Sequence, residues 1–318
     1  MNKYTSLIVV AAFATSCSSS LAPLRKDGLK PTVVTETVLH DTDDPAIWIH
    51  PTNPQESLVI GTDKDTDGGL YVFNLQGKII KKSETIKRPN NVDIAYGLQI
   101  DGVLTDIAVT TERETNKIHT RPSDKTVFAI VGRKSGPSGS YLWQYELKGT
   151  SNAKVEATLM RKFGAYSGKK EIEAIAVDNE LGAVYYCDEQ FGIRKYKADP
   201  ALNDNQELAL FGQKDFKSDH EGMAIYKSSA TTGYILVSNQ QANSFMVYPR
   251  EGSNGNPNDY QLLAEIPTST IECDGADVTA INLGQPFDKG LFVAMSNGKT
   301  FHFYDWKIIQ EAIDKHKK

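Results

Sequence analysis

The residues of this chain that are best suited to chemistry are carboxylates in unusual surroundings. Glu173 stands in an otherwise apolar run, Ile172–Val177, and a carboxylate buried without a partner is costly. Asp219 and Glu221 flank His220, so on a strand both carboxylates would point to the same face. Carboxylate oxygens are the preferred ligands of hard cations such as calcium. The pattern favours a cation site, with a surface turn as the alternative for Asp219 and Glu221. We expect His220 to be a packing or hydrogen-bonding residue and not a ligand.

Two other acidic stretches allow more than one interpretation. Asp43 and Asp44 precede Pro45, where they would either begin a strand or contribute oxygen ligands. Residues 63–68 have the spacing of an EF-hand loop, but Asn74 stands at the twelfth position, where that loop needs a glutamate. We therefore expect a solvated turn over residues 63–68, with a peripheral calcium site as the alternative.

Several other phosphate-handling and metal chemistries lack their motifs. The chain contains no Arg-His-Gly run for a histidine nucleophile and no Gly-x-x-x-x-Gly-Lys-Ser/Thr phosphate loop. Cys187 and Arg194 are spaced one residue too far apart for a cysteine-phosphatase loop. Cys187 and Cys273 have no histidine at ligand spacing, which argues against zinc. A disulfide between them stays open, although two buried free thiols are the preferred interpretation.

A largely β fold has to position these residues. The 318 residues are 40% hydrophobic, which is ample for a large core. Short runs of Val, Ile, Tyr and Phe bounded by Gly, Asp, Asn and Pro predict strands along most of the chain. The one convincing helix is predicted over Trp306–Lys315, where Ile308, Ile309 and Ile313 recur at near-helical spacing.

An internal repeat indicates how the strands are organised. Five short segments end in the aromatic residues Phe73, Tyr145, Tyr196, Tyr248 and Tyr304, and the last four recur at intervals of about 50 residues. That length holds four short strands and their turns, the size of one propeller blade. The first interval is longer and leaves room for a sixth copy. The sequence predicts an all-β fold, a six-bladed β-propeller over residues 31–318, with a β-sandwich of chance spacing as the alternative.

One blade is predicted to be truncated. The sixth copy is a damaged one at Asn116-Lys117-Ile118, and the chain from there to Tyr145 is too short for a whole blade. We expect two or three strands to be absent, either from this blade or from an incomplete neighbour.

The N-terminal segment has the features of an export signal. Lys3, the short apolar run Leu7–Phe13 and the small residues before Cys17 predict a lipoprotein signal peptide over residues 1–17, with lipidation of Cys17. An ordinary secretory signal is the alternative. We expect residues 18–30 to be a tether. The protein would be held at the cell envelope, periplasmic or on the outer-membrane surface, or would be extracellular.

Net charge limits the partners. The formal net charge of −5 gives no overall basic field, so nucleic acid is not an expected partner. No later stretch is long and apolar enough to span a bilayer, so membrane contact is expected only through the lipid anchor at Cys17. We expect a monomer that acts on a small molecule.

Five motifs together resemble the β-propeller phytases over nearly all of residues 35–310. They are Asp41-Thr42-Asp43-Asp44-Pro45-Ala46-Ile47-Trp48-Ile49-His50-Pro51; Asn90-Asn91-Val92-Asp93; Ile172-Glu173-Ala174-Ile175-Ala176-Val177-Asp178 with Asp188-Glu189; Ser218-Asp219-His220-Glu221-Gly222-Met223; and Cys273-Asp274-Gly275-Ala276-Asp277-Val278. Any one of these motifs could arise by chance, but five in the order of that family are specific.

The resemblance implies several calcium ions at one mouth of the central channel, with the phosphates of the substrate bound to those ions and to nearby cations. The implied calcium ligands are Asp43, Asp44, Glu173, Glu189, Asp219, Glu221, Gln240 and Asp274, with the carbonyl of Val92. The implied phosphate-binding cations are Lys64, Arg113 and Arg133, with Lys134 as the alternative to Arg133.

The chain departs from the family pattern at two places. The strand that carries a phosphate-contacting tyrosine should lie between Ile118 and Pro122, and it is missing. Glu272 stands two residues before Asp274, where the family more often has an aspartate; glutamate still binds calcium with a longer arm.

The function implied by the resemblance is that of a 3-phytase. Such an enzyme would hydrolyse phosphate monoesters of myo-inositol hexakisphosphate (phytate) by calcium-activated water, without a covalent intermediate. Crowded carboxylates raise one another's pKa, and bound calcium would remove that repulsion and attract a polyanion. The alternatives are a non-catalytic calcium-dependent propeller that binds a phosphorylated ligand, and another calcium-propeller hydrolase such as a phosphodiesterase or lactonase.

Overall fold

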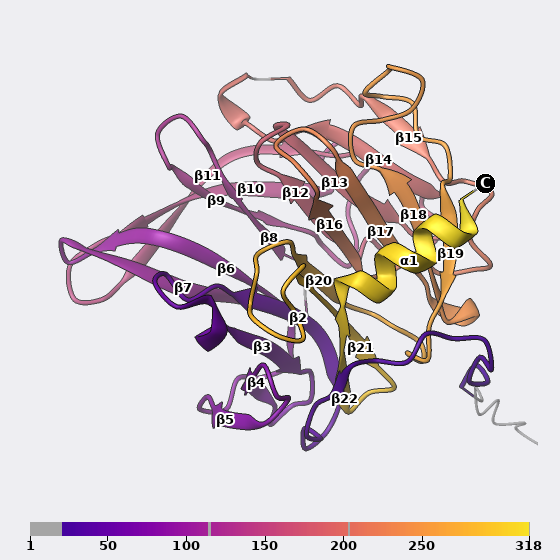
Figure 1. Ribbon diagram of the computed structural model, residues 1–318. Coiled ribbons are helices and arrows are strands. Elements are labelled where there is room, and N and C mark those ends of the chain that lie inside the picture. The colour runs from indigo at the N-terminus through magenta and orange to yellow at the C-terminus, as the bar shows by residue number, and fades with distance from the viewer. Residues whose placement is uncertain (1–20, 114–115, 203, 318) are drawn as a thin grey trace, which may run out of the picture.

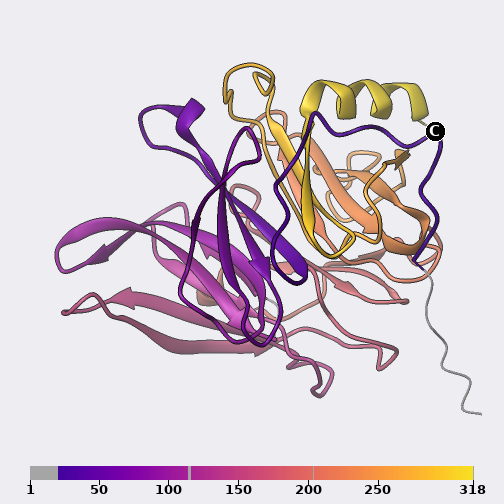
Figure 2. The same cartoon turned by 90° about the horizontal axis from the view of Figure 1, so that it is seen from below.

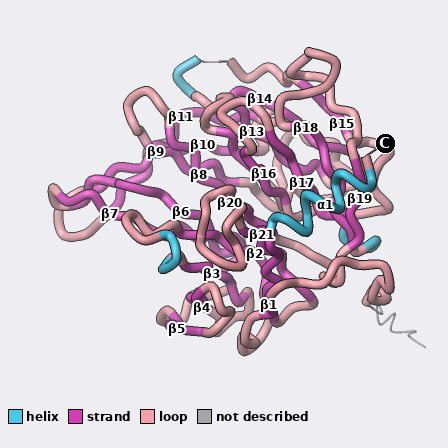
Figure 3. Tube along the Cα trace, in the orientation of Figure 1, coloured by secondary structure: helices cyan, strands magenta, loops and turns pink. Residues whose placement is uncertain are grey.

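The computed structural model describes residues 21–113, 116–202 and 204–317, and strands dominate it (Figure 3). The predicted signal peptide, residues 1–17, and the predicted anchor Cys17 lie outside the described residues. Within the described part of the chain, no helix has both the length and the apolarity to cross a bilayer.

Five antiparallel sheets of four strands surround a central axis (Figures 1 and 2). They comprise β2 (Thr42–Trp48), β3 (Leu58–Asp63), β4 (Gly69–Asn74) and β5 (Ile79–Lys82); β8 (Asn116–Thr120), β9 (Val127–Val131), β10 (Leu142–Gly149) and β11 (Val155–Phe163); β12 (Ile175–Asp178), β13 (Ala183–Asp188), β14 (Gly192–Lys197) and β15 (Ala209–Phe211); β16 (Met223–Lys227), β17 (Gly233–Asn239), β18 (Ser244–Pro249) and β19 (Ala264–Pro267); and β20 (Ala276–Thr279), β21 (Leu291–Ser296), β22 (Thr300–Asp305) and β1 (Val33–Val34). Short 3-10 helices lie at Pro54–Glu56, Pro200–Leu202 and Gln240–Ala242. The fold is an all-β propeller.

A sixth sheet has only two strands, β6 (Pro89–Ile100) and β7 (Val103–Glu112). The prediction of six blades is therefore wrong for the described chain: five sheets are complete blades, and this ribbon lies where another would be. The position given to the truncation is also corrected. Residues 116–145 belong to the complete sheet β8–β11, because Asn116-Lys117-Ile118 lies in its first strand and is not a damaged copy of the repeat. The incomplete sheet is the neighbour, which was the second alternative.

The innermost strands form a closed ring that includes the ribbon. Strands β2, β6, β8, β12, β16 and β20 contact one another in that order, and β20 returns to β2. The N-terminal strand joins the beginning of the chain to its last sheet. It is the outermost strand there, because β1 pairs with β22, with Val33 opposite Phe303 and Val34 opposite His302. Figure 2 shows this indigo segment beside the yellow C-terminal strand. Part of the predicted tether lies along the propeller as well, since Leu29 bridges Thr268 and Arg25 pairs with Glu265 at 3.1 Å.

Apolar side chains between neighbouring sheets make the core. The largest cluster joins the first and last blades, where the rings of Phe73 and Phe301 meet edge to face with centroids 5.8 Å apart. The predicted helix is confirmed as α1 (Trp306–His316), capped by Asp305, whose side chain accepts a hydrogen bond from the amide of Lys307. The indole of Trp306 stacks on the Tyr226 ring at 3.5 Å. The predicted buried free thiols, Cys187 and Cys273, are also confirmed.

A fully buried ion pair joins two blades. The Arg250 guanidinium, which follows β18, donates to both carboxylate oxygens of Asp178 at the end of β12, at 2.5 and 2.7 Å, and to the carbonyl of Ser229 at 2.8 Å. Neither Arg250 nor Asp178 has any exposed side-chain surface. Loss of either partner would leave the other charge buried and uncompensated.

We expect Arg250→Ala to lower the free energy of unfolding by about 3–5 kcal/mol, because Asp178 would remain buried without its cation. Urea denaturation followed by tryptophan fluorescence measures this. The control is Lys317→Ala, which removes the exposed pair with Asp314 and should cost less than about 1 kcal/mol. Equal costs for the two variants would contradict the cross-blade role of Arg250.

Candidate metal centre

Strand order brings the candidate residues to one end of the ring. Carboxylates lie at the starts of the innermost strands: Asp43 and Asp44 in β2, Glu173 before β12, Glu221 before β16 and Asp274 before β20. Other candidates follow the second strands: Lys64 after β3, Arg113 after β7, Arg133 and Lys134 after β9, Glu189 after β13 and Gln240 after β17. In an antiparallel sheet, the end of the second strand lies beside the start of the first. Residues far apart in the sequence therefore share one mouth of the ring.

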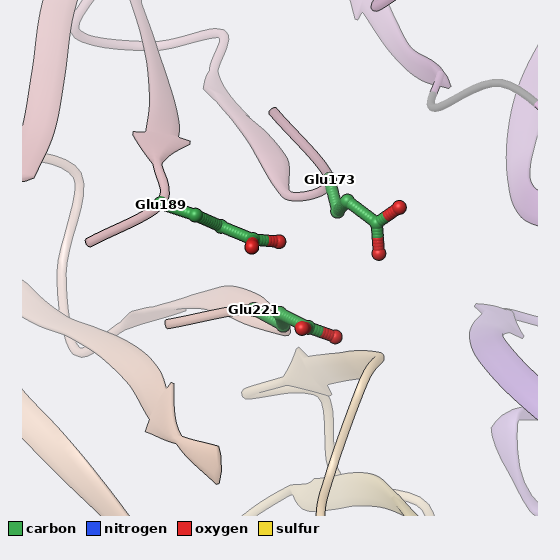
Figure 4. Close-up of side chains that lie close together, drawn as sticks. All are labelled: Glu173, Glu189 and Glu221. Atoms are coloured by element: carbon green, nitrogen blue, oxygen red, sulfur yellow. The ribbon is translucent and has the colours of Figure 1, made fainter. Parts of the chain in front are cut away.

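Three glutamates form what we call the acidic cluster: Glu173, Glu189 and Glu221. One carboxylate oxygen from each lies within 4.8 Å of the others, and Figure 4 shows the three side chains reaching into one space from separate segments. Glu189 is completely buried, and its Oε1 receives no hydrogen bond from the described residues. An orphaned buried oxygen next to two other carboxylates is suited to a hard cation.

A second group of charges surrounds Lys64. Its ammonium lies 2.8 Å from Asp274 Oδ2 and 3.7 Å from Asp43 Oδ1. Gln240 Nε2 donates to the other oxygen of Asp274 at 2.6 Å. Asp274 also interacts electrostatically with Glu221 and helps to raise the pKa of that carboxyl. The group around Lys64 therefore adjoins the acidic cluster.

Lys170 links Asp219 to the acidic cluster. Its ammonium is 2.8 Å from Glu189 Oε2, 2.8 Å from Asp219 Oδ2 and 3.8 Å from Glu221 Oε1. The side-chain amides of Gln190 and Gln241 donate to Asp219 at 2.8 and 2.9 Å. Asp219 therefore shares its cation with two glutamates of the cluster.

A third group lies on the innermost strands β2, β6 and β8. Asp44 accepts a hydrogen bond from the amide of Val92 at 3.1 Å, and Lys117 lies 3.5 Å from Asp93. A cavity of about 10 Å³ is lined by Asp44, Lys117, Glu173 and Asp274 among others. Residues from all three groups line this cavity, so the three groups are neighbours.

Burial and mutual repulsion shift the pKa values of these carboxyls. Burial, followed by the charge of Asp274, raises the pKa of Asp43 to about 7 despite Lys64. Burial likewise raises the pKa of Glu189 to about 7, against the opposing effect of Lys170. The pKa values of Asp44 and Glu221 are raised well above the ordinary range, again mainly by burial. For Asp219, burial is outweighed by hydrogen bonds from Lys170 and Gln190, and its pKa is lowered.

The predicted phosphate-binding cations lie in different surroundings. Lys64 contacts carboxylates as described above. Lys134 lies 2.8 Å from Glu171 and also contacts Glu173. Arg133 lies over the Trp143 ring, 4.9 Å from its centroid. Arg113 is exposed and has a positive φ of 62°. Of the alternatives Arg133 and Lys134, it is Lys134 that reaches the acidic cluster.

Three further predictions from the sequence can be compared with the structure: the role of His220, the turn at residues 63–68 and the missing strand. His220 is buried, stacks on Phe216 with centroids 4.5 Å apart and lies 3.3 Å from the carbonyl of Gly192, so its packing role is confirmed. Residues 64–68 form the turn between β3 and β4, whereas Asp63 is the buried last residue of β3 and does not belong to the predicted solvated turn. Between Ile118 and Pro122 the chain completes β8, the first strand of a whole sheet, and then turns; the outer strands are missing from the sheet β6–β7 of the described chain, and not at this position.

Sequence reasoning missed four charged residues of these groups. Asp93 and Asp277 stood inside motifs that had been recognised, and both carboxylates act on Lys117. Lys117 is on the innermost strand β8, which had been interpreted as a damaged repeat. Lys170 lies three residues before Glu173, and no periodicity marked it. A search for cations near each candidate ligand would have found Lys170.

Comparisons with known proteins agree with this architecture. The family model described as Phytase matches residues 4–137 and 119–316. A curated 3-phytase of Bacillus subtilis (strain 168) is 28% identical over 315 residues, which cover 86% of this chain and 80% of that protein. Among solved structures, a luciferin-regenerating enzyme is 16% identical with a TM-score of 0.50, over 86% of this chain and 95% of that chain. That likeness shows the propeller fold alone.

The raised pKa values of Asp43 and Glu189 predict a pH effect in the metal-free protein. A carboxyl whose folded pKa is about 7 and whose unfolded pKa is about 4 stabilises the fold below the unfolded value and loses that contribution as pH rises through 7. The double variant Asp43→Asn/Glu189→Gln has no such loss. Relative to wild type, its free energy of unfolding should therefore increase by about 2 kcal/mol or more between pH 5 and pH 8.

Chemical denaturation of both proteins in chelator, at several pH values, measures the difference and cancels contributions from the histidines. A constant difference across this range would show that the two carboxyls titrate normally.

Proposed function

The chain belongs to the phytase family, and we propose that it hydrolyses phosphate monoesters of phytate in a calcium-dependent reaction with water as the nucleophile. The observation that carries the proposal is the convergence of Glu173, Glu189 and Glu221 beside the ammonium groups of Lys134 and Lys170. Lys64 adds a third ammonium group on the neighbouring Asp274. A site for a polyanion needs cations, and a site for calcium needs oxygens. This mouth of the ring has both.

The oxygen donors present fit calcium. Carboxylates dominate the set, and no group of the described chain donates a hydrogen bond to the buried Glu189 Oε1. Glu173, Glu189 and Glu221 would hold one ion, and Asp43, Asp44, Asp219, Gln240, Asp274 and the Val92 carbonyl are the further ligands proposed for others. When bound, calcium would supply positive charge to the phosphate oxygens and acidify the attacking water. Zinc is disfavoured because no histidine or thiol belongs to the set.

The cations of the chain would bind and orient the phosphates. Lys64 acts as a point charge next to Asp43 and Asp274, while the exposed guanidinium of Arg113 suits two-point contact with one phosphate. Lys134 would stabilise negative charge beside Glu173. Each of these groups comes from the end of a second strand, so the sheets hold them on the same side as the carboxylates.

The two alternative functions have less support than phytate hydrolysis. A non-catalytic propeller and a phosphodiesterase or lactonase both account for bound calcium. Neither accounts for the similarity to a 3-phytase over 86% of the chain. A panel of phytate, a phosphodiester and a lactone separates the three. Removal of the phosphate at the 3-position first is proposed by analogy with that relative.

Export and lipid anchoring are also part of the proposal. The small residues before Cys17 support cleavage there and attachment of the protein at the cell envelope. We further propose that the protein acts on its small-molecule substrate as a monomer. Cys17→Ser should release the protein from the membrane fraction and abolish labelling by radioactive palmitate in a bacterial host. Continued labelling of the variant would rule out Cys17 as the attachment point.

Phosphate release from phytate should require calcium and the residues named here. We expect release in calcium, loss in excess EGTA and recovery when calcium is restored. Glu173→Ala and Lys64→Ala should each lower kcat/KM by at least about 100-fold, because a ligand or a charge-stabilising donor is lost. The control Glu311→Gln changes an exposed helix residue and should leave turnover unchanged.

Circular dichroism of each variant shows whether the fold survives. Full activity in excess EGTA would reject calcium dependence. Calcium-dependent binding of phytate without phosphate release would favour the non-catalytic alternative.

A further inference from the structure

Lys170 has three carboxylate neighbours from two segments, Glu189 after β13 and both Asp219 and Glu221 before β16. Its ammonium lies 2.8 Å from Glu189 Oε2, 2.8 Å from Asp219 Oδ2 and 3.8 Å from Glu221 Oε1. Two of these residues belong to the acidic cluster. Burial disfavours the charged amine, yet hydrogen bonds to Asp219 and Glu189 and the nearby charges raise the pKa of Lys170 overall. The ammonium therefore lies among oxygens that are proposed to bind calcium.

We propose that Lys170 is a resident counter-ion of the acidic cluster, which calcium displaces and which then binds a phosphate of the substrate. The inference rests on the proposed function and adds a substrate-binding residue to it. Two steps are needed: displacement by calcium, and capture of phosphate by the released ammonium.

Displacement follows from the shared oxygens. Calcium binds six to eight oxygens at about 2.3–2.6 Å, and Glu189 has only two. An ammonium 2.8 Å from one of those oxygens would lie close to a bound calcium ion and be repelled by it. The doubly charged ion gains more from the cluster than the single charge does. Lys170 must then move away from the cluster. The free energy lost when its ammonium leaves the carboxylates lowers the apparent affinity of the site for calcium.

The side chain has somewhere to go. It is 39% exposed, whereas Glu189 is fully buried and Glu221 nearly so. Lys170 lies in residues 164–174, which have no regular secondary structure between β11 and β12, and its four-carbon stem is flexible. Outward movement would place the ammonium at the rim of the mouth, beside the calcium that attracts the polyanion. An unpaired ammonium there binds phosphate as a point charge.

Lys169 provides a matched control. It is the adjacent residue and is exposed, its ammonium donates to the carbonyl of Gln190 at 3.2 Å, and it lies over the Phe191 ring. It carries the same charge on the same loop, but within the described part of the chain its ammonium contacts the Gln190 carbonyl and the Phe191 ring and forms no ion pair with the acidic cluster. A nonspecific effect of loop charge would change both lysines alike.

Two titrations of the full chain test the proposal. Protein stripped with chelator is titrated with calcium by calorimetry, and calcium-saturated protein is titrated with inorganic phosphate. Lys170→Met keeps the stem and removes the charge, so it should bind calcium at least about tenfold more tightly than wild type. The same variant should bind inorganic phosphate several-fold more weakly and raise the KM for phytate more than it lowers kcat. Lys169→Met should resemble wild type in both titrations, and Lys170→Arg should retain phosphate binding.

The opposite signs of the two effects make the proposal falsifiable. Unchanged or weaker calcium binding by Lys170→Met would overturn displacement, and unchanged phosphate binding would overturn capture. Equal effects of Lys169→Met and Lys170→Met would also overturn the proposal. The proposed function is judged separately by phytate turnover in wild type: failure of turnover with the calcium titrations as expected would reject the function and not the displacement.

Discussion

The burial of several carboxylates at one mouth of the ring is the constraint on which the proposed site depends. Glu189, Glu221, Asp43 and Asp44 are all buried at one end of the ring, and burial with mutual repulsion raises their pKa values. Lysines 64, 134 and 170 offset part of this charge in the structure. Because each lysine supplies one positive charge, the mouth stays rich in acceptors, which suits divalent cations.

The propeller fold brings residues that are distant in the sequence together at one site. Every candidate residue lies near the start of a first strand or after the end of a second strand, so the outer two strands add no candidate residue. The ribbon β6–β7 illustrates this, since it supplies Val92 and Arg113 although its outer strands are absent. The pairing of β1 with β22 and the unbroken contacts of the innermost strands keep the mouth intact around the incomplete sheet. The loss of half a blade is therefore compatible with the proposed chemistry.

The charged residues that stabilise the fold differ from those proposed to act in function. The Arg250–Asp178 pair lies between blades with no exposed side-chain surface, where its partners are fixed and its role is structural. The lysines at the mouth are partly exposed, so they have room to exchange partners when an ion or a phosphate arrives. A buried pair and a rim pair can have similar distances, but only the rim pair is able to rearrange without water entering the core.

The sequence by itself determined the strand-rich composition, the repeat of about 50 residues, the C-terminal helix and the types of residue at the site, because these features depend on local periodicity and on motifs that are contiguous in the chain. Only the tertiary structure decided which sheet is incomplete. Asn116-Lys117-Ile118 has the same local pattern whether it is the first strand of a whole blade or the remnant of a broken one, and its hydrogen-bonded partners settle the matter. The structure likewise decided that Lys134 reaches Glu173 while Arg133 turns to Trp143, and that Lys170 lies among three carboxylates. Contacts of this kind join segments that are tens of residues apart, and their distances are set by how the sheets pack around the axis.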